Sequence, residues 1–248
     1  MQNEEGLIIG RNAVAEALKS GREIDSLFVA KGERSGSIGK IIGQCRELGA
    51  VVKEVDPRKL DKICSGENHQ GVAAFAAVHE YGTVEYMLKK AEEKGENPFI
   101  IVCDEIEDPH NLGAIIRTAD ACGAHGVIIP KRRGVSLTYA VGKVSAGAVE
   151  YVTVARVPNI AAELETLKKK GFWVYGADMD GTLWSEQDYS GSVALVIGSE
   201  GRGISRLVKE KCDFIVSLPM KGHINSLNAS VAAGILMYKV TENRQRGD

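Results

Sequence analysis

The most constraining feature of this sequence is a regular alternation between short apolar runs and longer stretches of helical periodicity. The run Phe99–Cys103 is continuously apolar, as in a strand that is buried on both faces of a sheet. Helical periodicity follows at 111–122 and is clearest at 227–240. Because strands that alternate with helices favour parallel pairing, we predict an α/β fold with mostly parallel sheets.

The alternation divides the chain into two parts. Residues 81–97 are rich in Glu and Lys, which indicates an exposed connecting helix, so we place a linker there between domains at 1–80 and 98–248. The first domain is expected to be a small α/β/α unit. Its predicted helices are 12–19 and 38–48, and its predicted strands are 26–30, 50–55 and 71–77. In the second domain, strands are predicted at 99–103, 126–129, 151–155, 172–176, 193–197 and 214–218, and helices at 111–122, 160–170, 204–211 and 227–240.

Composition narrows the class of protein. A net charge of −2 over 248 residues argues against general coating of nucleic acid, although the basic run at 131–133 fits a phosphate contact and a solvated face equally. The longest apolar stretch, 72–78, is too short to span a membrane, and the acidic N-terminus does not resemble a secretory signal. Five cysteines without a C-x-x-C pair indicate reduced thiols and no metal site. We therefore expect a cytoplasmic protein.

The first chemically suggestive segment follows the strand at 99–103. Pro109 ends that strand, and Asn111 occupies the expected N-cap of the next helix. Gly113 and Arg117 are one helical turn apart, so we expect open space beside the Arg117 guanidinium. Alone, this segment fits a capped helix with an exposed arginine just as well.

The second segment follows the strand at 193–197. Gly198, Gly201 and Gly203 lie within six residues, which allows a ligand to approach the backbone closely at the carboxyl end of a strand. The spacing G-x-x-G-x-G differs from the dinucleotide fingerprint, and the chain contains no phosphate-loop motif. Nucleotide triphosphate hydrolysis is therefore disfavoured.

The third segment runs from Leu218 to Ser230. A strand is expected to end at Leu218, and the next helix to begin near Ser226, a good N-cap residue. Asn228 is a poor helix former in the first turn of that helix, which makes it a candidate for function. The loop at 221–225 carries no residue-level expectation.

The three segments, taken in order, resemble the motifs of the SpoU (TrmH) family, which are RNA ribose 2′-O-methyltransferases of the SPOUT class. The resemblance rests on Asn111-x-Gly113-x-x-x-Arg117, Gly198-Ser-Glu200-Gly201-x-Gly203, and Leu218-Pro-Met220 with Ser226-Leu227-Asn228. The N-terminal part resembles the family's L30e-like substrate-binding domain through Gly10–Leu18 and His69–Val72. For His69 and Gln70, contact with RNA and a plain polar turn remain equally open.

The resemblance implies the fold, cofactor and partners. It implies a deep trefoil knot in the C-terminal domain and a homodimer in which the motif face is buried. S-adenosylmethionine would be held by backbone around Gly198, Leu218 and Leu227, with Met220 in the same motif. The substrate would be structured RNA rather than DNA, and the most similar subgroup methylates a guanosine of 23S rRNA.

The resemblance also implies the catalytic residues. It places Arg117 at the acceptor ribose, but a guanidinium that is always protonated is a poor base. Our hypothesis is that Arg117 lowers the pKa of the 2′-hydroxyl and binds the adjacent phosphate, which can accept the proton. The side chains that would orient Arg117 and the ribose are Asn111, Glu200, Ser226 and Asn228; Glu200 could instead stabilise the dimer.

Three alternatives remain. A tRNA 2′-O-methyltransferase would carry the same motifs. A non-catalytic RNA-binding module would need none of the polar residues named above, so their joint presence argues against it. A Rossmann-type oxidoreductase is disfavoured by the glycine spacing.

Overall fold

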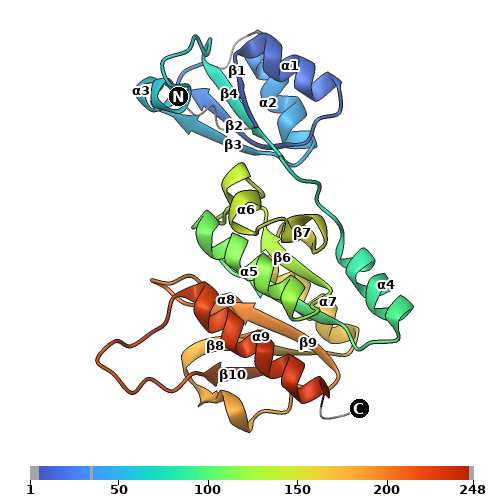
Figure 1. The fold of residues 1–248 in the computed structure, drawn as a ribbon. Helices are drawn as coiled ribbons and strands as arrows, with labels where there is room; N and C mark the ends of the chain where they lie inside the picture. Colours follow the sequence, from blue (N-terminus) through green and yellow to red (C-terminus); the bar gives the residue numbers. More distant parts are fainter. Residues whose placement is uncertain (1–5, 34–35, 246–248) are drawn as a thin grey trace. The chain divides into compact units, whose positions relative to one another are not determined.

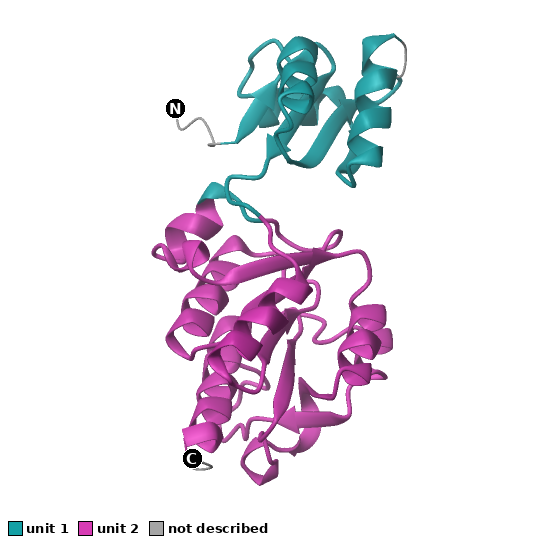
Figure 2. Cartoon of the chain, turned by 90° about the vertical axis from the view of Figure 1, so that its right-hand side faces the viewer, with its two compact units in different colours: residues 1–80, 137–139 teal, residues 81–136, 140–248 magenta. Residues whose placement is uncertain are grey.

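The computed structural model describes residues 6–33 and 36–245, and the chain forms two compact units. Unit 1 comprises residues 1–80 and 137–139, and unit 2 comprises residues 81–136 and 140–248 (Figure 2). In the described part of the chain, no helix is long and apolar enough to cross a membrane.

Unit 1 is a small α/β/α unit. Its four-stranded sheet has the order β1-β4-β2-β3, in which β2 and β3 are parallel and β4 is antiparallel to both of its neighbours. Helices α1 and α2 share one apolar core with the sheet, and α3 contributes Leu60 to a second core. The elements are β1 Leu7–Ile9, α1 Arg11–Lys19, β2 Ile24–Ala30, α2 Ser37–Glu47, β3 Val51–Val55, α3 Pro57–Ile63 and β4 Val72–Ala76.

The two sequence segments that resemble the substrate-binding domain meet in unit 1. Gly10, at the N-cap of α1, has a φ of +92° and supplies no side-chain cap. The Gln70 side chain supplies it instead, because its Oε1 accepts a hydrogen bond from the Arg11 backbone N–H at 3.2 Å. His69 Nδ1 accepts from the Gly71 N–H at 2.9 Å, which holds the turn before β4. Both side chains therefore have a structural role in this turn.

Unit 2 contains a six-stranded sheet whose strands are all parallel, in the order β10-β8-β9-β5-β6-β7. The prediction of an α/β fold with a parallel sheet is confirmed for this unit. The elements are α4 Val84–Lys94, β5 Phe99–Cys103, α5 Pro109–Ala121, β6 Gly126–Pro130, α6 Tyr139–Val144, β7 Thr153–Val157, α7 Ile160–Lys169, β8 Phe172–Leu183, β9 Ser192–Ile197, α8 Arg206–Lys209, β10 Phe214–Ser217 and α9 Ala229–Gln245.

Helices cover both faces of this sheet. Residues of α4, α7 and α8 form one core with alternate residues of the strands, such as Ile100 and Val102 of β5. Helices α5 and α9 pack against each other on the other face (Figure 1). The loops that follow β5, β8, β9 and β10 therefore gather at the carboxyl edge of the sheet, where open α/β sheets bind ligands.

Helix α4 differs from the sequence-based expectation. Residues 81–97 were expected to form an exposed linker, but Val84, Met87 and Ala91 of α4 are buried. Met87 packs so closely on β6 that a side chain at Gly126 would meet its sulfur at 2.4 Å. The expectation failed because the buried stripe of α4 is narrow and the rest of the helix is charged. Residues 81–97 therefore belong to unit 2.

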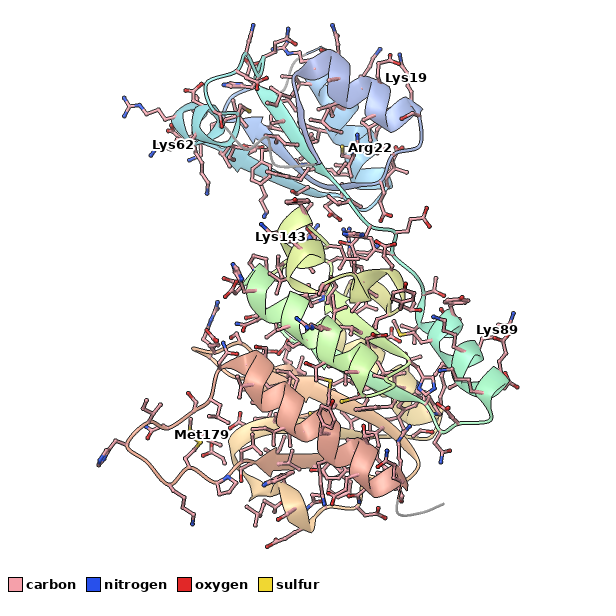
Figure 3. All side chains as sticks on the ribbon, viewed as in Figure 1. Lys19, Arg22, Lys62, Lys89, Lys143 and Met179 are labelled. Carbon is pink, nitrogen blue, oxygen red and sulfur yellow. The ribbon has the colours of Figure 1, made fainter. Side chains whose placement is uncertain are left out.

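Strand β8 is longer than predicted and carries a pronounced irregularity. Gly176 pairs with Ile215 of β10 while Thr182 pairs with Val216, so residues 177–181 bulge out of the ladder. Gly181 allows β8 to pair with β10 again after the bulge, because a Cβ there would lie 2.6 Å from the Ile215 backbone. Met179, within the bulge, is exposed (Figure 3).

The cysteines are free and largely buried. Cys45, Cys64, Cys103 and Cys122 are buried, and Cys212 is partly buried. Desolvation raises the pKa of the Cys103 and Cys212 thiols to about 12, so both are protonated at neutral pH.

Candidate functional site: a cofactor pocket and its polar rim

The loop after β9 is a tight turn that requires glycine. Ser199 and Gly203 exchange two backbone hydrogen bonds, with N–O distances of 3.1 and 2.8 Å. A Cβ on Gly198 would lie 2.1 Å from the carbonyl carbon of Gly203, so no other residue fits there without moving the loop. Gly203 has a φ of +65°. A Cβ on Gly201 would meet nothing within 4 Å, so this glycine is not required by packing.

The same loop is connected to the loop after β5. The Ser205 N–H donates to the buried Asp104 carboxylate at 2.7 Å. The Arg202 guanidinium forms ion pairs with the carboxylates of Glu105 and Glu107, at N–O distances of 3.7 and 3.5 Å. The Arg202 side chain is 72% exposed in both pairs. Exposed pairs of this kind contribute little free energy, so the bond to Asp104 is the firmer connection.

The start of α9 differs from the prediction. Ser226 was expected to be the N-cap, but the helix begins at Ala229 and Asn228 is its cap. Asn228 Oδ1 accepts hydrogen bonds from the backbone N–H groups of Ser230 and Val231, at 3.0 and 3.2 Å. The prediction that Asn228 lies within the first turn of the helix is therefore wrong, and its side chain has a structural role as the cap. Ser226 is exposed in the preceding loop.

The start of α5 also differs from the prediction. Asp108, not Asn111, is the N-cap, and its carboxylate accepts from the His110 N–H at 2.8 Å. Asn111 is one turn further on and only 5% exposed. Gly113 leaves no open space beside Arg117: a Cβ there would lie 2.7 Å from Val144, so this glycine lets α6 approach α5.

Three predicted site residues from distant segments meet in one hydrogen-bonded group. Asn228 Nδ2 donates to Asn111 Oδ1 at 2.9 Å and also to Glu200 Oε1. Asn111 Nδ2 donates to the same Glu200 oxygen at 3.2 Å. The group joins α5, the glycine loop and the cap of α9, so it links the three sequence motifs.

Arg117 differs from these residues. It is exposed on α5, and among the described residues it makes no hydrogen bond or ion pair. Its guanidinium is therefore available to a ligand or to another chain, and no hydrogen bond or ion pair to residues 6–33 or 36–245 fixes its orientation.

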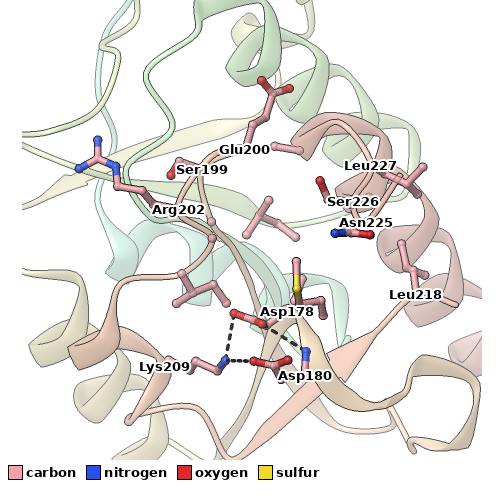
Figure 4. Close-up of a pocket in the computed structure, with 18 of the residues that line it drawn as sticks. Asp178, Asp180, Ser199, Glu200, Arg202, Lys209, Leu218, Asn225, Ser226 and Leu227 are labelled. Atoms are coloured by element: carbon pink, nitrogen blue, oxygen red, sulfur yellow. Dashed lines mark hydrogen bonds and ion pairs between the residues drawn. The ribbon is translucent and has the colours of Figure 1, made fainter. Parts of the chain in front are cut away.

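A cavity of about 510 Å³ lies between the glycine loop and the segment before α9. All four residues predicted to bind the cofactor line it, namely Gly198, Leu218, Met220 and Leu227. Glu200 and Ser226 also line it (Figure 4). Arg117, Asn111 and Asn228 are not among the lining residues. The volume is within the usual range for small-molecule sites, about 300–1,000 Å³.

The cavity suits a nucleoside-type cofactor. Apolar side chains such as Leu218, Leu227 and Ile197 can flank a flat base, and the loop at 198–203 lines the cavity beside them. The hydroxyl of Ser199, which lines the cavity, is buried and has no hydrogen-bond partner among the described residues. A ligand with polar groups could satisfy it.

Several lining residues were not anticipated from the sequence. Asp178 and Asp180 come from the β8 bulge, Lys209 from α8, and Asn225 from the loop for which we had no expectation. Asp178 could have been found, because it follows a predicted strand and ligands bind at the carboxyl ends of such strands. The bulge itself leaves no recognisable pattern in the sequence.

Comparison with known proteins shows the family of this chain. Residues 98–238 match the model of the SpoU rRNA methylase family, and residues 7–82 match an RNA 2′-O ribose methyltransferase substrate-binding model. The chain is 49% identical over 245 residues to YacO of Bacillus subtilis, which is assigned to the TrmH family of tRNA/rRNA methyltransferases; the match covers 98% of each chain. The fold and site thus define an RNA methyltransferase. This chain belongs to the SpoU (TrmH) family.

Solved structures support the same fold. The SpoU methyltransferase AviRb from Streptomyces viridochromogenes, in complex with AdoMet, superposes with a TM-score of 0.61 at 24% identity, covering 97% of this chain and 91% of that one. An RNA 2′-O ribose methyltransferase superposes with a TM-score of 0.56 at 26% identity, covering 96% and 88%.

Proposed function

We propose that this protein transfers a methyl group from S-adenosylmethionine to a ribose 2′-hydroxyl of structured RNA, and that the nucleotide is a guanosine of 23S rRNA. The observation that carries the proposal is the hydrogen-bonded group of Asn111, Glu200 and Asn228 at the edge of the cofactor-sized cavity. The three residues come from separate motifs, and packing alone does not require their polar side chains to meet.

The cavity residues would hold the cofactor. Backbone around Gly198, Leu218 and Leu227, together with Met220, would enclose it, and the Ser199 hydroxyl offers an unused hydrogen bond. S-adenosylmethionine supplies an activated methyl group on a sulfonium, and the protein has to align the acceptor oxygen with it. Alignment alone can supply much of the rate.

Arg117 is the residue that we assign to the ribose 2′-hydroxyl that accepts the methyl group. Its guanidinium is exposed and has no hydrogen-bond or ion-pair partner in the part of the chain that the structure describes. It can bind a phosphate and stabilise a developing oxyanion on the 2′-oxygen, which lowers the pKa of the hydroxyl. The group of Asn111, Glu200 and Asn228 would orient the ribose, with Ser226 beside it. Because Glu200 accepts two amide hydrogen bonds in this group, we favour this role over one in dimer formation.

Unit 1 would bind the RNA. Its match to a substrate-binding model supports this role, and we propose that it is the L30e-like domain expected from the sequence. The description of YacO names both tRNA and rRNA. A tRNA 2′-O-methyltransferase therefore remains the second candidate function.

We also propose a homodimer and a trefoil knot. The exposed face of α9 carries Val231, Ile235 and Tyr238, which are 49%, 37% and 56% exposed, and a partner subunit would cover them. The strand order, together with the meeting of the loops after β9 and β10 in one cavity, supports a knot in this region. The cytoplasmic location stays a prediction from the sequence.

The test is methyl transfer to RNA from a strain that lacks the gene. The purified protein is incubated with labelled S-adenosylmethionine and either 23S rRNA or bulk tRNA, and the product is digested to nucleosides. We expect label in 2′-O-methylguanosine from 23S rRNA only. Label in tRNA alone would support the second candidate, and label on a base rather than a ribose would overturn the proposed chemistry.

A further inference from the structure

Two carboxylates of the β8 bulge lie beside the cofactor cavity in different environments. The Asp178 side chain is only 14% exposed, and its Oδ2 lies 3.1 Å from Lys209 Nζ. The Asp180 side chain is 79% exposed and lies 3.7 Å from the same nitrogen (Figure 4). Asp178 is thus held inward by a lysine, whereas Asp180 extends into solvent.

Asp178 keeps hydrogen-bonding capacity to spare. Its Oδ1 accepts from the Asp180 N–H at 3.3 Å and its Oδ2 pairs with Lys209. An ionised carboxylate has about four acceptor positions, so about two remain for a ligand in the cavity that Asp178 lines. A carboxylate so placed can accept hydrogen bonds from hydroxyl groups but repels anions.

The position of Asp178 relative to the glycine loop is informative. The loop follows β9, and Asp178 follows the regular part of β8, the strand parallel and adjacent to β9. Asp178 Oδ2 lies 3.5 Å from where a Cβ of Gly203 would be, so the carboxylate lies close to the loop. The Rossmann dinucleotide fold offers an analogy: there a glycine loop after one strand and a carboxylate further along the chain bind the same nucleotide, and the carboxylate hydrogen-bonds the ribose 2′-hydroxyl. The present chain lacks the Rossmann glycine spacing but places a glycine loop and a carboxylate after adjacent strands.

We propose that Asp178 binds the ribose 2′- and 3′-hydroxyls of the adenosyl cofactor and that Lys209 orients its carboxylate. The inference rests on the use of S-adenosylmethionine proposed above. It assigns a binding residue outside the three sequence motifs, on a bulge that those motifs do not include.

The test compares ribose recognition in matched variants. Calorimetry measures binding of S-adenosylhomocysteine and of its 2′-deoxy and 3′-deoxy analogues to the wild-type protein, Asp178→Asn and Asp180→Asn. A hydrogen bond to a charged acceptor contributes about tenfold or more in affinity. We therefore expect the wild-type protein and Asp180→Asn to prefer the full ribose by about tenfold or more, and Asp178→Asn by about threefold or less.

Each other outcome is decisive. Equal binding of the three ligands by the wild-type protein overturns the inference even if Asp178→Asn does not fold. Undiminished preference for the full ribose in a folded Asp178→Asn overturns it as well. If the wild-type protein does not bind S-adenosylhomocysteine at all, the proposed cofactor itself is wrong, and that failure is distinguishable from the other two.

Discussion

The two sides of the candidate site are built differently. The cofactor side is formed by backbone and close packing: Gly198 has no room for a side chain, and the loop at 198–203 is closed by its own hydrogen bonds. The acceptor side depends on one exposed arginine, Arg117, which has no partner among the described residues. If the proposed roles are right, we expect one chain to form the cofactor side alone, and RNA or a second subunit to fix the orientation of Arg117 on the acceptor side.

This difference suggests that binding and catalysis can be separated by mutation. Changes to the loop backbone should abolish cofactor binding, and changes on α5 should affect methyl transfer alone. The hydrogen-bonded group of Asn111, Glu200 and Asn228 connects α5, which carries Arg117, with the glycine loop, so we expect it to hold the two sides in register.

The largest expected effect is that of Gly198→Ala. The added Cβ would lie 2.1 Å from backbone and must displace the loop, so we expect affinity for S-adenosylhomocysteine to fall by about a hundredfold or more, together with a lower melting temperature. Gly43→Ala is the control, because a Cβ there would meet nothing within 4 Å and Gly43 does not line the cavity. Calorimetry showing equal affinity in both variants would mean that the loop does not form the cofactor site.

The next effect concerns the two units. Removal of residues 1–80 should leave unit 2 folded, because its sheet and cores are formed within residues 81–248, and cofactor affinity should stay unchanged. We expect kcat/KM for the RNA to fall by more than about tenfold, since one of two linked binding modules is lost. Unimpaired turnover of full-length RNA by the truncated protein would refute this division of roles.

The smallest effect concerns the exposed face of α9. Tyr238→Glu places a charge in an apolar patch that we expect a second subunit to cover, and should weaken the dimer by about 1 kcal/mol or more, roughly fivefold. Leu48→Glu, at another exposed apolar residue, is the control and should not change the association. Sedimentation equilibrium measures both. A wild-type protein that is monomeric at micromolar concentration would contradict the proposed dimer.

The sequence predicted the parallel sheet of unit 2 well, because strands such as Phe99–Cys103 are continuously apolar. All five residues of that strand are buried in the structure. It predicted helix starts poorly. Asn111 and Asn228 are both of a residue type that favours the N-cap, but only Asn228 is a cap in the structure. Which residue becomes the cap depends on where the preceding strand ends. The interpretation of Gly113 failed because α6 was not predicted and fills the space.

Within the site, the sequence motifs identified the residues that line the cavity along the glycine loop and before α9. They did not include Asp178, although its place just after the predicted strand at 172–176 could have drawn attention to it. The bulge itself could not be predicted, because it arises from the register of β8 with β10 and local periodicity does not encode strand pairing. The mixed sheet of unit 1 was missed for a similar reason, since local pattern does not determine strand direction.

The most direct test of the separation between the two sides is Arg117→Lys. Lysine keeps the charge and is a good helix former, but it loses the forked geometry of the guanidinium. We predict that single-turnover methylation slows by about a hundredfold or more, while affinity for S-adenosylhomocysteine and the melting temperature stay unchanged. Near-normal methylation by the folded lysine variant, or an equal loss of cofactor affinity, would contradict the account.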